Sequence, residues 1–287
     1  MRIPQLRHVY ASLADLNDQL TDSGASLLTN TGANVRKLEI LDEVSRLIDA
    51  KAHRGTGFGP WVGTFAYDGD SCDTLWLRAD LAALTSLSYR ATTGATPTTP
   101  VVDTDFYLGG IGGYEPPYRR IIFHGQGTPT AFGSGIKVTR VTGTWTYPYR
   151  TRVLTVTTGE ALDDSETEVD VSGLTGLSPG MTILVDDEQM YVTAVTDGVT
   201  DSITVERGVN GTTAASHLTA AAITRYVYAP SVTTLALRLA EKRWKARDAG
   251  ADGLDGGNDI GTVSLREGED TIIRRMLGAP IMLSGQV

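Results

Sequence analysis

Apolar residues recur at helical spacing near the start of the chain. Three leucines between Leu13 and Leu20 follow Ser12, a residue type that caps helices, so a first helix is predicted over residues 10–20. A longer apolar stripe predicts a second helix over residues 34–53, and its members are Val35, Leu38, Leu41, Val44 and Ile48.

The second predicted helix has an apolar surface wider than one stripe. Ile40 and Leu47 lie on a face of their own, outside that stripe. Such a surface must be covered on more than one side, either by the rest of the chain or by a second subunit. If a second subunit covers it, the contact would include Leu38, Leu41 and Ile48.

Helical spacing returns near the end of the chain. Pro230 suits the first position of a helix, and we predict that this helix spans residues 230–248. Basic side chains crowd its second half, namely Arg238, Lys242, Arg243, Lys245 and Arg247. These could form a solvated face, an ion-pairing surface for an acidic neighbour, or a contact with DNA.

A glycine-rich loop separates this helix from the C-terminal segment. A short last helix is predicted over residues 270–277, because Asp270 can cap it and Gly278 can end it. The apolar residues Ile281, Met282 and Leu283 follow without an obvious partner in the sequence. We expect this tail to become ordered when it binds another protein.

Between the two helical ends, the pattern favours strands separated by turns. Residues 64–147 contain five candidate strands, which are Thr74–Arg78, Leu84–Arg90, Val101–Leu108, Tyr118–His124 and Ile136–Tyr147. Residues 149–226 follow as a second β-rich block with shorter strands, frequent turns and a more acidic composition.

This order predicts an α+β protein. Neither helical end has enough partners alone, so we expect the two ends to pack together into a helical core. That core would contain residues 1–148 and 227–287, including the strands between 64 and 147. Residues 149–226 would then form an inserted all-β domain that folds independently.

Composition narrows the classes of function. The chain has 287 residues and a formal net charge of −9, which argues against general binding to nucleic acid. It contains one cysteine, so an internal disulfide and a cysteine-based zinc site are excluded.

Candidate chemical motifs are weak. The histidines lack metal-ligand spacing, and the turn Asp186-Asp187-Glu188 is interpreted as a solvated hairpin tip. The segment Asp252–Asp259 resembles one turn of a calcium-binding β-roll, which needs stacked repeats. The glycine-rich segments Gly55–Gly59 and Gly109–Gly113 lack the phosphate-loop and dinucleotide-fold contexts. We therefore predict neither a catalytic site nor a metal or cofactor site.

Several stretches, in order, resemble a known family. Tyr10–Leu16 with Leu38–Asp49 resembles its N-terminal helix pair, and Cys72–Leu77 with Leu84–Leu87 resembles its first strands. A later strand and a long helix are similar to Val138–Tyr147 and Pro230–Asp248. The family comprises the head-to-tail connector proteins, also called adaptor or head-completion proteins, of long-tailed bacteriophages. The similarity covers roughly residues 10–148 and 227–280.

The block at 149–226 departs from that family, whose later strand runs almost directly into the long helix. The end of the block, Arg207–His217, resembles a small β-module that recurs in phage virion proteins. The role of this module stays open.

The resemblance implies a ring, usually of twelve subunits, beneath the portal protein in the virion neck. Such a ring, built from chains made in the host cytoplasm, extends the DNA channel without reading sequence and carries the next neck protein, a stopper or tail terminator. An acidic lumen would repel DNA and let it slide. Two rival functions are a minor tail or decoration protein whose β-module binds a partner or host glycan, and a cell-wall hydrolase with paired carboxylates.

Overall fold

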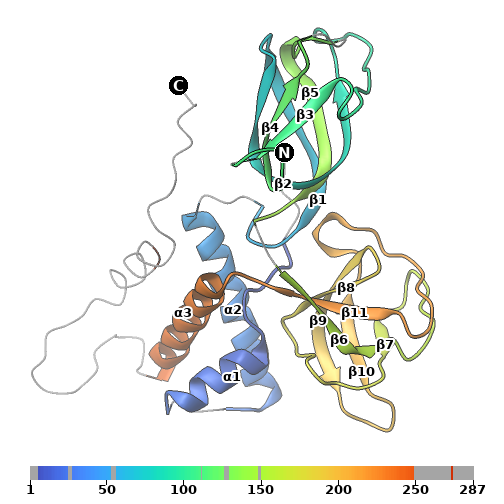
Figure 1. The fold of residues 1–287 in the computed structure, drawn as a ribbon. Coiled ribbons are helices and arrows are strands. Elements are labelled where there is room, and N and C mark those ends of the chain that lie inside the picture. Colours follow the sequence, from blue (N-terminus) through green and yellow to red (C-terminus); the bar gives the residue numbers. More distant parts are fainter. Residues whose placement is uncertain are drawn as a thin grey trace, which may run out of the picture. The chain divides into compact units, whose positions relative to one another are not determined.

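The computed structural model describes residues 6–24, 28–52, 56–110, 112–125, 129–147, 150–248 and Ile273. The described chain is mostly antiparallel β-sheet, with eleven strands in two sheets and three α-helices (Figure 1). The predicted α+β fold with a helical core is therefore wrong. Each sheet has its own large apolar core, so the strands, rather than the helices, organise most of the chain.

The three helices lie close to their predicted positions. They are α1 (Leu13–Asp22), α2 (Thr31–Lys51) and α3 (Pro230–Asp248). Ser12 caps α1 as expected, because its hydroxyl accepts from the Asp15 amide while the Asp15 carboxylate accepts from the Ser12 amide. The helix predicted over residues 270–277 lies outside the described residues except for Ile273, which is helical and buried. No described helix is long and apolar enough to span a membrane.

The first sheet follows the second helix. Its strands lie in the order β1-β5-β2-β4-β3, and their bounds are β1 (Trp61–Asp70), β2 (Thr74–Tyr89), β3 (Phe106–Gly110), β4 (Tyr118–Phe123) and β5 (Ser134–Trp145). Two predicted strands merge into the long β2, and β1 was not predicted. Gly63 and Gly69 interrupt the apolar alternation in β1, yet they also allow close packing. A Cβ at Gly69 would lie 1.7 Å from the Gly133 carbonyl oxygen.

The second sheet is built from the 149–226 block. Its order is β6-β11-β8-β9-β10-β7, with bounds β6 (Arg150–Thr157), β7 (Glu168–Asp170), β8 (Thr182–Val185), β9 (Glu188–Thr196), β10 (Ser202–Glu206) and β11 (Ala222–Val227). Aliphatic side chains such as Ile183, Met190, Val192 and Ile203 fill its core. The predicted hairpin around Asp186-Asp187 is confirmed, since β8 and β9 pair on either side of this turn.

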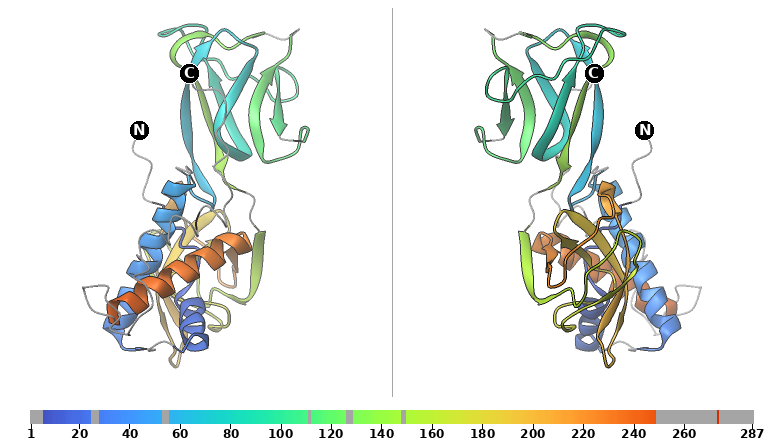
Figure 2. Two further views of the ribbon diagram at one scale, coloured as in Figure 1. Left: turned by 90° about the vertical axis from the view of Figure 1, so that its left-hand side faces the viewer. Right: turned by 90° about the vertical axis from the view of Figure 1, so that its right-hand side faces the viewer.

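The chain divides into two compact units. Among the described residues, one unit contains Leu6 and residues 56–147, and the other contains residues 7–52 and 150–248. The three helices therefore belong with the six-stranded sheet rather than with residues 56–147, a division that differs from the predicted one. Within this second unit, the helices pack together beside the sheet (Figures 1 and 2).

The first residues of the second unit form hydrogen bonds with the six-stranded sheet and its loops, which we call the β-module (residues 150–227). Asn210 Oδ1 accepts from the Arg7 amide at 2.7 Å, and the Arg7 guanidinium pairs with Glu206 at 2.8 Å. Further along, the Pro179 carbonyl accepts from the Leu13 amide at 3.0 Å. The backbone before α1 thus finds its hydrogen-bond partners on the β-module.

Candidate functional site

Two of the three apolar residues predicted to contact a second subunit are buried within the chain itself. Leu41 and Ile48 are fully buried, and Leu38 is half-buried. Leu38 packs close to the β-module, because a Cβ added at Gly180 would lie 3.1 Å from Leu38 Cδ2. Helices α1 and α3 pack against α2, and Leu38 lies close to Gly180 of the module, whereas Val35 of the predicted stripe is 51% exposed.

The basic residues of α3 are partly used within the chain. Arg243 pairs with Glu43 of α2 at 2.8 Å, and Lys245 pairs with Glu241 at 2.7 Å. Arg238 is exposed and Lys242 is half-buried, while the side chain of Arg247 lies outside the description. The predicted tail residues Ile281, Met282 and Leu283 also lie outside the described residues.

A buried lysine joins the three helices, a feature that sequence reasoning missed. Lys37 is fully buried, and its ammonium donates to Asn17 Oδ1 and the Leu28 carbonyl, each at 2.7 Å. It also lies 5.0 Å from the centre of the Trp244 ring of α3. The sequence could have indicated its burial, because Lys37 lies four residues after Ala33 and four residues before Leu41, and both of these residues are buried on the same face of α2.

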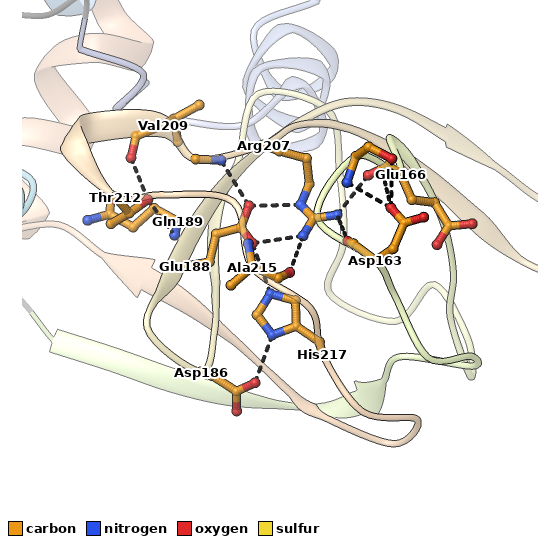
Figure 3. A network of polar contacts seen from close by, with 12 residues as sticks. Asp163, Glu166, Asp186, Glu188, Gln189, Arg207, Val209, Thr212, Ala215 and His217 are labelled. Atoms are coloured by element: carbon orange, nitrogen blue, oxygen red, sulfur yellow. Dashed lines mark hydrogen bonds and ion pairs between the residues drawn. The ribbon is translucent and has the colours of Figure 1, made fainter.

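The densest polar cluster lies at one end of the six-stranded sheet (Figure 3). Arg207 follows β10 and forms two parallel hydrogen bonds to Glu188 at the start of β9, both of 2.8 Å. The same guanidinium donates to the carbonyl oxygens of Asp163, Glu166 and Ala215. Arg207 therefore fastens the β6–β7 loop and the β10–β11 loop to one strand end.

The Glu188 carboxylate has no free acceptor site for a ligand. Besides both bonds from Arg207, it accepts from the Gly208 amide at 2.9 Å, the Ala215 amide at 3.0 Å and His217 Nε2 at 2.9 Å. Its side chain is 1% exposed, so it is buried rather than a solvated hairpin tip as predicted. Burial raises the pKa of Glu188, but the hydrogen bonds from Arg207, His217 and the two amides outweigh it and lower the pKa to about 2.

His217 lies between two carboxylates. Its Nδ1 is 2.7 Å from Asp186 and its Nε2 is 2.9 Å from Glu188. The ring therefore links the exposed turn residue Asp186 to the buried Glu188.

The residues of the segment Arg207–His217 either take part in this polar cluster or form the tight turn that follows β10. Gly208 has a φ of +60°, and a Cβ there would lie 2.9 Å from the Ala214 amide nitrogen. Asn210 also has a positive φ of 55°, and its buried amide group donates to Gln189 at 3.0 Å. Thr212 Oγ1 accepts from the Gln189 amide at 3.0 Å. The residues that stand out in the sequence are thus the ones that hold the loop in place.

This cluster is a structural node rather than a reaction centre. A general base or metal ligand needs a free lone pair that can reach its target, and every site on Glu188 is taken. In the part of the chain that the structure describes, no group of three histidine, cysteine or carboxylate side chains is placed to hold a metal ion. One feature of the sequence could have indicated this cluster. Residues 150–227 contain twelve acidic residues but only four basic ones, and Arg207 is one of those four.

Comparisons with known proteins give no relative for this chain. No family model, no curated protein and no solved structure matches it.

Proposed function

We propose that this protein is a structural component of a bacteriophage neck, a head-to-tail connector that forms a ring beneath the portal. The proposal starts from the ordered sequence resemblance in residues 10–148 and 227–280. In that position the chain would contact copies of itself, the portal and the following neck protein, while DNA passes through the channel. Such a role requires surfaces for assembly and no catalytic group.

The structural observation that carries the proposal is the division of charge over the helices. The exposed residues Asp15, Asp18 and Asp22 follow one face of α1, which has no basic residue. The exposed face of α3 carries Arg238 and Lys245. A ring needs a heterologous interface, in which two different patches of each copy are complementary, and opposite charges on two helices meet this requirement.

Charge reversal tests this interface. Reversing the acidic face (Asp18→Lys with Asp22→Lys) or the basic face (Arg238→Glu with Lys245→Glu) should each weaken assembly. A chain carrying all four substitutions should regain it, because each interface again joins opposite charges. Assembly is measured by native mass spectrometry at low salt, with and without the portal protein. If both variants with one reversed face lose assembly and the variant with all four substitutions does not regain it, the proposed interface is wrong.

Placement in the virion tests the function itself. In particles assembled with an epitope-tagged copy of this chain, antibody label should lie between head and tail. Label along the tail or over the capsid would instead favour a minor tail or decoration protein, and would overturn the connector proposal.

A further inference from the structure

The outer face of strands β2, β4 and β3 is unusually aromatic. Side chains alternate between the two faces of a strand, and Leu77, Ile121 and Phe106 point into the core of this sheet. The opposite face carries six residues that we call the aromatic face, namely Trp76, Tyr107, Tyr114, Arg120, Ile122 and His124. The strand register places Trp76 beside Arg120, and Tyr107 beside Ile122.

Exposed aromatic rings gather on this face. Trp76 and Tyr114 are each 64% exposed, and Tyr107 is 38% exposed. Among the described residues, every other tryptophan, tyrosine and phenylalanine is buried or half-buried. Tyr107 lies 5.8 Å from Tyr114 and 3.9 Å from His124, measured between ring centres. A contiguous exposed patch of this kind marks a binding surface.

Unused hydrogen-bonding groups lie among these rings. The Arg120 guanidinium lies 5.7 Å from the Trp76 ring centre, and its Nε has no hydrogen-bond partner among the described residues. Gly109 makes room for this side chain, since a Cβ there would lie 2.6 Å from Arg120 Nε. His124 Nε2 is shielded and also lacks a partner among the described residues. The face therefore combines exposed rings with a guanidinium group that lies beside one of them.

We propose that the aromatic face binds an oligosaccharide. A pyranose ring has a flat face of C–H groups that stacks on an aromatic ring, and a rim of hydroxyl groups that accept from arginine and histidine. Three adjacent strands span about 10 Å, which is wide enough for a short chain of sugars rather than one ring. The binding site takes stacking from Trp76, Tyr107 and Tyr114, and hydrogen bonds from the Arg120 guanidinium.

Charge favours a sugar over a nucleic acid on this face. Single-stranded nucleic acid also stacks on aromatic rings, but its phosphates require a positively charged groove. Residues 56–147 contain seven acidic and six basic residues, and Arg120 is the one lysine or arginine among the six residues of the face. A neutral glycan therefore fits better than a polyanion. The inference is independent of the ring proposal.

Trp76 provides a direct readout of binding. The other tryptophans, Trp61, Trp145 and Trp244, are at most 2% exposed, so acrylamide quenching of the full chain reports mainly on Trp76. Chitohexaose and cellohexaose are the probes. We expect at least one to protect Trp76 from acrylamide in a saturable way. Tyr114→Ala should weaken that protection about tenfold, equivalent to about 1.4 kcal/mol.

A matched control variant and tests for two other occupants, a nucleic acid and a second copy of the chain, make the experiment decisive. Ile136→Ala removes another exposed side chain on β5, which β2 separates from β4 and β3, and should bind like the unchanged chain. No saturable protection by either sugar, or equal protection in Tyr114→Ala, would overturn the proposal. The proposal would also be overturned if a thymidine oligonucleotide protected Trp76 in a salt-sensitive way while neither sugar protected it. Protection that rises with protein concentration alone would show a second copy on this face and would also overturn it.

Discussion

At the scale of single residues, the Arg207–Glu188 pair shows why a buried charge needs its partner. Removing one partner leaves the other charge buried and uncompensated, which costs about 3–5 kcal/mol. We therefore expect Arg207→Ala to destabilise the second unit by about this amount. Hydrogen exchange of the β8 and β9 amides should show it, because this measurement reports on one unit separately. The exposed Arg152→Ala should change protection little, and a similar loss in that variant would contradict the argument.

The pH dependence of Glu188 follows from its lowered pKa. The pKa is about 2 in the folded chain, against an ordinary value of 4.5 for a glutamate. The ionised carboxylate therefore stabilises the fold fully above about 4.5, and this contribution is lost as the pH falls from 4.5 through 2. The difference in unfolding free energy between the unchanged chain and Glu188→Gln should be constant above pH 5 and should narrow below 4.5. An unchanged difference down to pH 2 would disagree with the geometry of Figure 3.

Asn210 combines a backbone role with a side-chain role, and two substitutions separate them. Asn210→Gly keeps the positive φ but loses the hydrogen bonds to Arg7 and Gln189. Asn210→Ala loses these bonds and must also adopt a left-handed conformation, at an extra cost of about 1–2 kcal/mol. The alanine variant should therefore unfold at lower urea concentration than the glycine variant, as followed by exchange of the β9 amides. Equal midpoints would show that the conformation carries no cost.

At the scale of elements, periodicity located the helices because each buries one or more apolar stripes. Pro230 marked the start of α3, and Ser12 marked the start of α1. The strand β1 was missed because glycine has no hydrophobic signal, although close packing needs it at Gly69. Lys37 was missed because a buried lysine depends on partners that only the folded helices bring together.

The candidate site was harder to predict than the elements. The sequence indicated a turn at Asp186-Asp187, which the pairing of β8 with β9 confirms. The resemblance of Arg207–His217 to a phage virion module stays a prediction. The sequence did not place Glu188 next to Arg207, since these residues are joined by pairing between β8, β9 and β10 rather than by proximity in the chain. The aromatic face was missed for the same reason, because its residues come from three strands and a loop.

At the scale of the whole molecule, the two compact units have separate cores, and this makes a deletion informative. The six-stranded sheet and the helices share hydrogen bonds through Arg7, Leu13, Pro179 and Asn210, whereas residues 56–147 enclose their own cluster around Trp145. If residues 149–226 form an independently folding insertion, as the sequence predicts, replacing residues 150–226 with a Gly/Ser linker should leave the helices folded. The shared hydrogen bonds argue instead for deleting residues 57–147.

Replacing residues 57–147 with a flexible Gly/Ser linker should leave the second unit folded. Its apolar core and the Arg207–Glu188 node lie wholly within the retained chain, so their burial is kept. In this deletion Trp244 is the one tryptophan left, and its fully buried ring should keep a blue-shifted fluorescence that shifts cooperatively in urea.

Replacing residues 150–226 instead should expose Leu38 and leave the Arg7 amide without its partner on the module, which should loosen the helices and red-shift the fluorescence of Trp244. Because that chain keeps the other tryptophans, Trp61, Trp76 and Trp145 are changed to Phe there, and the same three changes in the full-length chain give the reference spectrum. If the helices stay intact without residues 150–226 and unfold without residues 57–147, the module is an independent insertion, and the division into units described above is wrong.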